Sequence, residues 1–178
     1  MICHIQKFRD KLAAGQLALG AGVTFSDPAV VEALGPTVDF LWIDLEHCPI
    51  GIETLAGHLI ATRAAGTPAL VRVPGSDVAL IKRVLDTGAE GIIVPQVRSV
   101  AEVQRVVDAC RYPPLGRRGW GPRRPSDYGR RSIEQIVEQA NRQLFVVAQI
   151  ETTEAVEAID QIVAIEGLDS VVLGPYDL

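Results

Sequence analysis

Residues 39–48, DFLWIDLEHC, combine an apolar strand with a cluster of polar side chains. Aromatic and aliphatic residues fill most of the first seven positions, as in a strand that is buried on both faces. Asp44, Glu46 and His47 then fall within four positions. We therefore expect a buried strand that brings acids and an imidazole to one end of a sheet.

Five other apolar runs, rich in Val, Ile and Leu, are typical of parallel strands. They occupy residues 17–23, 68–73, 91–97, 144–150 and 170–174. Segments with helical spacing lie between the runs, at residues 27–35, 51–65, 76–87, 99–111, 132–143 and 152–166. This alternation predicts repeated right-handed crossovers and a parallel α/β sheet.

Helix start and stop signals support these boundaries. The expected starts are Asp27-Pro28 and two capping boxes, Ser99 with Glu102 and Ser132 with Gln135. The expected stops are Gly66 and Gly88. The sheet could be doubly wound or closed as a (β/α)8 barrel. No GxGxxG motif follows the first strand, which disfavours a dinucleotide-binding sheet and hence an NAD site.

Length and composition predict one compact domain, residues 1–178. The chain has 48% hydrophobic and 22% charged residues, as folded globular proteins do. Its net charge of −5 gives no reason to expect a nucleic acid or another polyanion as a partner.

Neither export nor membrane insertion is expected. The first ten residues lack the basic start and apolar run of a secretory signal, and no stretch reaches about 18 uninterrupted apolar residues. We therefore expect a cytoplasmic protein with no membrane partner. Cys3, Cys48 and Cys110 form no CxxC pair, which favours buried or idle thiols over a disulfide framework or a zinc site.

One long irregular segment, RYPPLGRRGWGPRRPSDYGRR at residues 111–131, has a length that is usually functional or mobile. Six arginines lie between residues 117 and 131, interleaved with Trp120 and Tyr128, as in some RNA-binding patches. The acidic chain has no second basic segment, so nucleic acid is disfavoured. We expect instead a loop folded over an anionic small molecule.

Polar residues follow every strand from the second to the sixth. They are Asp44, Glu46, His47, Arg72, Gln96, Gln149, Glu151 and Asp177. Because parallel strands all point the same way, we expect these side chains to meet at one rim, where such folds place their active sites. Taken singly, three of them could have a purely structural role: Glu151 as a favourable charge near a helix start, His47 as a surface residue, and Arg72 in an ion pair.

This set of residues favours a metal-assisted reaction. Two carboxylates on adjacent strands form a hard oxygen site that suits Mg²⁺ or Mn²⁺, whereas a closed zinc site is disfavoured. An arginine and a neutral histidine nearby could hold and protonate an oxyanion. Lys7, Lys11 and Lys82 are the only lysines and none ends a strand, so we expect no Schiff-base lysine and no PLP.

At these residues the chain resembles the HpcH/HpaI aldolase family, metal-dependent pyruvate aldolases that include 4-hydroxy-2-oxoheptanedioate aldolase and 2-dehydro-3-deoxyglucarate aldolase. The motifs that carry the resemblance are WIDLEH (42–47), LVRVP (70–74), LDTGAEGIIVPQV (85–97), YPPLGRRGWGP (112–122), QIET (149–152) and GPYDL (174–178). The resemblance implies a TIM barrel of the phosphoenolpyruvate/pyruvate type. It also implies a class II aldolase that reversibly splits a 4-hydroxy-2-oxo acid into pyruvate and an aldehyde.

The resemblance implies how metal and substrate would bind. Glu151 and Asp177 would hold a divalent cation, Mg²⁺, Mn²⁺ or Co²⁺, and pyruvate would chelate it through its carboxylate and keto oxygens. Gln149 would lie close to the metal site. The backbone near Gly174 and Pro175 would help to hold the pyruvate carboxylate.

The resemblance also implies the catalytic roles. Arg72 would contact the keto oxygen and stabilise the enolate. His47, oriented by Asp44, would act as acid and base on the hydroxyl of the aldol. Asp86 lies in a shared motif without an assigned role.

The chain ends at Leu178, directly after the second implied metal ligand, with six strands where a complete barrel has eight. We therefore expect a barrel domain that lacks its last part. The resemblance implies a homo-oligomer, either a trimer or a hexamer. Two other functions stay open: a citryl- or malyl-CoA-lyase-like carbon–carbon lyase, and a non-catalytic fragment that binds metal or keto acid.

Overall fold

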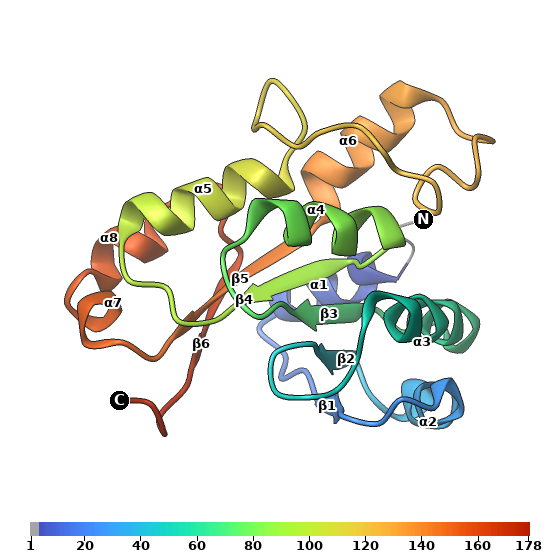
Figure 1. The fold of residues 1–178 in the computed structure, drawn as a ribbon, viewed down its shortest axis with the longest axis horizontal. Coiled ribbons are helices and arrows are strands. Elements are labelled where there is room, and N and C mark those ends of the chain that lie inside the picture. The colour runs from blue at the N-terminus through green and yellow to red at the C-terminus, as the bar shows by residue number, and fades with distance from the viewer. Residues whose placement is uncertain (1–3) are drawn as a thin grey trace.

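The computed structural model describes residues 4–178 as one six-stranded parallel sheet flanked by helices (Figure 1). The strands are β1 (Gly20–Val23), β2 (Phe40–Asp44), β3 (Ala69–Arg72), β4 (Gly91–Val94), β5 (Phe145–Ile150) and β6 (Ser170–Leu173). Each strand pairs with the next one along the chain, in the order β1-β2-β3-β4-β5-β6. A doubly wound sheet reverses direction at a switch point, whereas this order never does. The sheet is therefore a curled part of a barrel wall, which confirms the predicted barrel-type α/β fold.

The first helix precedes the first strand, and the other helices lie in the connections between successive strands. The helices are α1 (Ile5–Ala13), α2 (Pro28–Leu34), the 3-10 turn η1 (Gly35–Thr37), α3 (Ile52–Ala65), α4 (Val78–Thr87), α5 (Val100–Cys110), α6 (Ile133–Gln143), α7 (Thr153–Glu157) and α8 (Ile159–Val163). The single helix predicted at residues 152–166 is thus two short helices. Ala158 lies between them with a ψ of 9°, outside the helical range.

The predicted helix ends match local hydrogen bonds. Ser132 and Gln135 form a complete capping box, and the Asp27 carboxylate accepts the N–H of Ala29. The box predicted at Ser99 is only half formed, because the Glu102 carboxylate accepts from the N–H of Arg98 and the hydroxyl of Ser76. Gly66 and Gly88 end their helices with φ of 75° and 108°, which glycine adopts without strain.

The core is densest in the middle of the sheet. Every residue of β4 and β5 is buried, whereas β1 and β6 form the two edges and are partly exposed. Within residues 4–178, no helix is both long enough and apolar enough to cross a membrane. Cys110 is buried and Cys48 is partly buried, both as free thiols, whereas Cys3 lies outside the described residues.

Helix α1 packs where the strands begin. The Phe8 ring lies 5.1 Å from the rings of both Phe40 and Phe145, the first residues of β2 and β5. The buried Glu90, just before β4, accepts hydrogen bonds from the N–H groups of His4 and Ile5 at the start of α1. A carboxylate at a helix N-terminus satisfies donors that the helix itself leaves free.

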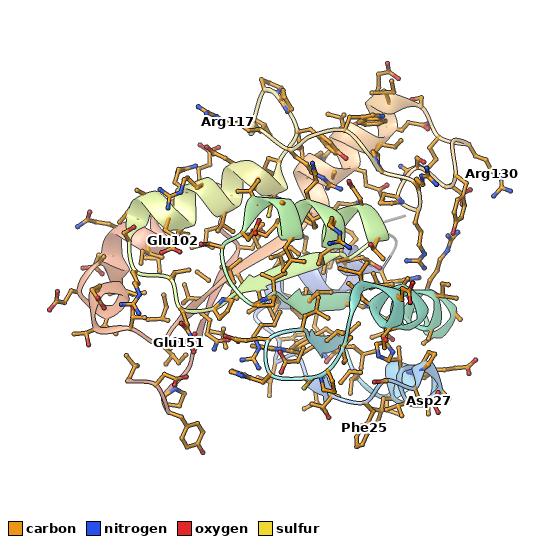
Figure 2. All side chains as sticks on the ribbon, viewed as in Figure 1. Phe25, Asp27, Glu102, Arg117, Arg130 and Glu151 are labelled. Atoms are coloured by element: carbon orange, nitrogen blue, oxygen red, sulfur yellow. The ribbon has the colours of Figure 1, made fainter. Side chains whose placement is uncertain are left out.

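The arginine-rich segment lies at this same end of the sheet, opposite the rim, and the expectation that it folds over an anionic small molecule stays a prediction. Arg118 pairs with Asp86 at 3.1 Å, and Asp127 pairs with Arg63 at 3.7 Å, near the C-terminal ends of α4 and α3. Figure 2 shows Arg117 and Arg130 far from Glu151, which follows β5. The physical reason is direction: a segment that follows a helix starts at the end of the sheet where the strands begin.

Candidate active site

Arg72 and Asp44 form the centre of a polar group at the carboxyl ends of the strands. The two residues face each other in the register of β2 and β3. The Nε and Nη2 groups of Arg72 donate to Oδ1 and Oδ2 of Asp44 at 2.9 Å and 2.7 Å, a two-pronged ion pair. Burial alone would raise the pKa of Asp44, but the hydrogen bonds from Arg72 and the backbone outweigh it and lower the pKa to about 2. Asp44 is therefore a fixed anion that orients the guanidinium.

The same Asp44 carboxylate organises the turn after β2. Its Oδ1 accepts the N–H of Glu46 at 3.0 Å and the N–H of His47 at 3.4 Å. The Cys48 thiol donates to Oδ2 at 3.4 Å. Asp44 thus contacts the backbone of His47, and the structure brings the His47 imidazole to a different carboxylate.

That carboxylate belongs to Glu46. Its Oε2 lies 3.5 Å from Nε2 of His47 and 3.2 Å from Nε of Arg72. The side chain of Glu46 is only 9% exposed, whereas that of His47 is 65% exposed. Burial raises the pKa of Glu46, although the charge of Arg72 opposes the rise.

Glu151 is a second buried carboxylate, directly after β5. Its Oε1 accepts the backbone N–H of Gln96 at 2.6 Å, and its Oε2 accepts from Nε2 of Gln149. Gln96 has a φ of 52°, which is unusual for a residue with a side chain and aims its N–H at Glu151. The Oε1 atom of Gln149 is buried and has no hydrogen-bond partner among residues 4–178, which fits a site that receives a ligand.

Gly174 connects Glu151 with the turn that carries Asp177. A methyl group on Gly174 would overlap the Glu151 carboxylate, so the close approach requires glycine. The N–H of Gly174 donates to the carbonyl of Ile150 at 3.0 Å, which holds the turn beside β5. Pro175 lies in this turn, and the exposed Asp177 follows it with its N–H donating to Gly174 at 3.3 Å.

Negative charge exceeds positive charge at this rim. The charges of Asp44, Glu46 and Glu151 all act on Arg72. When ionised, three carboxylates face one guanidinium, which leaves two uncompensated negative charges. Within the described residues, no three His, Cys, Asp or Glu side chains group closely enough to enclose a metal ion. Carboxylate oxygens such as those at the rim are the ligands that hard cations, Mg²⁺ among them, prefer.

The chain matches a known protein family over most of its length. Residues 23–178 match the model of the family described as HpcH/HpaI aldolase/citrate lyase. This chain belongs to the HpcH/HpaI family. It is similar to the 4-hydroxy-2-oxovalerate aldolase of Novosphingobium aromaticivorans, with 41% identity over 98% of this chain and 66% of that protein. It is also similar to a hydroxypyruvate/pyruvate aldolase of Roseovarius nubinhibens, with 38% identity over 96% of this chain and 67% of that protein.

The fold agrees with a solved member of the family. The crystal structure of an HpcH/HpaI aldolase from Desulfitobacterium hafniense DCB-2 superposes with a TM-score of 0.88 and 35% identity. The alignment covers 96% of this chain and 66% of that one. The chain thus spans about two thirds of the length of the relatives it matches.

In this HpcH/HpaI chain a cavity of about 320 Å³ opens beside the Arg72–Asp44 pair. This volume is within the usual range of small-molecule sites. Its other lining residues are Gly20, Ala21, Gly22, Thr24, Phe40 and Trp42. None of them was predicted as a site residue, although a glycine inside a strand, such as Gly22, can mark a place where a ligand approaches closely.

The structure places Asp86 away from the candidate site residues at the rim. Asp86 lies near the end of α4 and pairs with Arg118, whose guanidinium lies 4.6 Å from the centre of the Tyr112 ring. This ion pair fixes the arginine-rich segment at the end of the sheet opposite the rim. The remaining predicted residues lie at or just after the carboxyl ends of β2 to β6, at the rim.

Proposed function

We propose that this chain carries the active-site part of a metal-dependent class II pyruvate aldolase. The reaction is the reversible cleavage of a 4-hydroxy-2-oxo acid, such as 4-hydroxy-2-oxoheptanedioate or 2-dehydro-3-deoxyglucarate, to pyruvate and an aldehyde. Family membership supports an aldolase, since both relatives above bear aldolase names. The observation that supports this site is the two-pronged Arg72–Asp44 pair beside an excess of carboxylates.

Glu151 and Asp177 would hold the divalent cation, Mg²⁺, Mn²⁺ or Co²⁺. Both follow adjacent strands, and carboxylate oxygens are the ligands that these ions prefer. When bound, the cation would polarise the carbonyl oxygen of the keto acid as a Lewis acid. Gln96 and Gln149 fix Glu151 for this role from two sides.

Arg72 would donate to the keto oxygen of pyruvate. Its Nε and one N–H of Nη2 are engaged by Asp44, so Nη1 is the nitrogen left to face a substrate. A donor already fixed in place stabilises the developing enolate without further reorganisation. The backbone near Gly174 and Pro175 would contact the pyruvate carboxylate.

His47 would be the acid and base. Its imidazole would remove the proton of the C4 hydroxyl as the C3–C4 bond breaks and the electron pair moves into the enolate of pyruvate. Protonation of the enolate carbon then completes pyruvate, and the C4 fragment leaves as the aldehyde. With 65% of its side chain exposed, His47 can exchange protons with solvent.

The test is pyruvate release from 4-hydroxy-2-oxo acids of different lengths, with and without a chelator. We expect chelation to abolish release and added Mn²⁺ to restore it, whereas borohydride should have no effect because no imine forms. Release that requires a CoA thioester would instead identify a lyase of the citrate-lyase type. No release from any substrate, despite Mn²⁺ binding, would identify a binding fragment and refute the proposal.

Assembly and location are further proposals. We propose a homo-oligomer, a trimer or a hexamer, in the cytoplasm. The support is membership of the HpcH/HpaI family, because the resemblance to this family implies such an assembly. Analytical ultracentrifugation of the chain would test the assembly.

A further inference from the structure

The proposed mechanism assigns no role to Glu46, although this residue contacts both Arg72 and His47. Its side chain is nine-tenths buried and lies between the two residues to which that mechanism assigns proton transfer and enolate binding. One oxygen atom, Oε2, is near both the guanidinium of Arg72 and the imidazole of His47. This Oε2 has no hydrogen-bond partner among the described residues, and its close polar contacts are these two ion pairs, although the charges of Glu151 and Asp44 also act on Glu46.

Burial of a carboxylate is unfavourable unless cationic groups compensate it. The guanidinium of Arg72 lies 3.2 Å away and supplies one positive charge, which it shares with Asp44. His47 lies 3.5 Å away and supplies a second positive charge whenever its imidazole is protonated. Glu46 therefore links the guanidinium of Arg72, which must keep a fixed position, to the imidazole of His47, which must gain and lose a proton.

Asp44 does not occupy this position. Its two oxygens accept from Arg72, from two backbone N–H groups and from the Cys48 thiol. A carboxylate accepts about four hydrogen bonds, so the capacity of Asp44 is already used within the turn and on Arg72. Glu46 is the carboxylate that contacts the imidazole.

We propose that Glu46 is a positioning residue of this site, holding Arg72 and His47 in the relative arrangement that aldol cleavage requires. The proposal rests on the proposed function for its kinetic consequences, but the contacts themselves can be tested without turnover. Misplacement of a reacting group by about 1 Å can slow an enzyme about 100-fold, so removing this link should act mainly on kcat.

The test compares Glu46→Gln and Glu46→Asp with the matched control Glu154→Gln. Glu154 forms an exposed ion pair with Arg98 at 3.2 Å and is 54% exposed, so its substitution removes the same charge without a buried contact. We expect Glu46→Gln to lower kcat roughly 10- to 100-fold, with KM for the keto acid changing less than about threefold. Glu46→Asp keeps the charge and should recover part of the loss, whereas Glu154→Gln should match the wild type.

A second readout does not depend on activity. The side-chain Nε–H of Arg72 gives a separate signal in a ¹⁵N–¹H NMR spectrum, which Arg72→Lys identifies by its loss. Glu46→Gln should shift this signal, and Glu154→Gln should leave it in place. Thermal unfolding of each variant shows whether the fold is intact, and if Glu46→Gln does not fold, Glu46→Asp is judged by both readouts instead.

The outcomes separate the two proposals. If the wild type releases no pyruvate but the Arg72 signal shifts in Glu46→Gln, the function is wrong and the positioning contact is real. If the wild type is active while folded Glu46 variants keep wild-type kcat and an unshifted Arg72 signal, the inference about Glu46 is overturned and the proposed function is not.

Discussion

Two arginine–aspartate pairs of the molecule lie at opposite ends of the sheet, and they differ in their surroundings. Arg72 and Asp44 lie at the rim beside a cavity, where two more carboxylates act on the same guanidinium. Arg118 and Asp86 lie at the other end, where Arg118 is packed on the Tyr112 ring and only 2% of its side chain is exposed. One pair has excess charge and adjacent space, whereas the other is balanced and enclosed. An ion pair indicates a functional site when its charges do not balance and its donors face open volume.

The most direct way to break this comparison is Arg72→Lys. Lysine keeps the charge but cannot form the two-pronged contact with Asp44 or present a fixed donor to the substrate. Removal of one such donor typically costs a factor of about 10² to 10³ in kcat, so we expect a loss of that size with little change in melting temperature. A variant with wild-type kcat would show that the rim pair is structural, like the pair of Arg118.

Arg118→Met is the reciprocal change at the other end. It leaves Asp86 without its partner in a largely buried place, so we expect the free energy of unfolding to fall by about 3 kcal/mol while kcat stays near the wild-type value. Urea unfolding and the aldol assay measure the two effects. The double variant Arg118→Met with Asp86→Leu removes both charges and should recover most of the stability. A fall in kcat that exceeds the loss of folded protein would contradict the assignment.

The stability contributions of buried carboxylates at the two ends of the sheet, Glu90 at one end and Asp44 at the other, should also change with pH in opposite directions. Burial raises the pKa of Glu90 from 4.5 to about 7, although the N–H groups of His4 and Ile5 and the charge of Arg124 oppose the rise. As the pH rises, the Glu90 carboxyl group therefore loses its proton at a lower pH in the unfolded chain than in the folded protein. The contribution of Glu90 is fully present below about pH 4.5 and is lost by about pH 7, a change of about 3 kcal/mol. Asp44, whose pKa is lowered, instead stabilises the fold above its ordinary value and loses that contribution in acid.

Urea unfolding between pH 5 and pH 8 tests this difference. Glu90→Gln removes the titrating group and keeps an oxygen that can accept from the start of α1. We expect the variant to lack the loss of stability that the wild type shows between these pH values. Parallel pH profiles for the two proteins would refute the assigned role of Glu90.

The elements that sequence alone predicted are those set by local pattern. Apolar runs placed all six strands, and the polar residues after them placed the rim, because strand direction fixes where a strand ends. The position of residues 111–131 was open to the same argument, since the segment follows a helix and must start at the opposite end. The charge of the segment alone does not show at which end of the sheet it lies.

The partners of individual side chains could not be predicted. Asp44, Glu46 and His47 lie within four positions, and their spacing does not show which carboxylate reaches the imidazole. That depends on the turn, in which Asp44 accepts two backbone N–H groups and so leaves the contact with His47 to Glu46. The N–H of Gln96 on Glu151 is likewise a backbone contact that depends on a φ of 52°, which no residue type encodes by itself.

The smallest expected effect comes from Gly174→Ala, which tests whether the position of the Glu151 carboxylate matters for cation binding at the rim. Gly174→Ala places a methyl group against the Glu151 carboxylate, which Gln149 also contacts and which cannot move without losing the Gln96 hydrogen bond. Disturbing groups that orient a metal ligand typically costs 10- to 100-fold in affinity, so we expect Mn²⁺ binding to weaken by about 10-fold. Gly75→Ala is the matched control, because a methyl group there meets no atom within 4 Å. Titration calorimetry measures both. Equal Mn²⁺ affinity in the two variants would mean that cation binding does not depend on the position of Glu151. The excess of carboxylates at the rim would then not distinguish it functionally from the balanced Arg118–Asp86 pair at the other end.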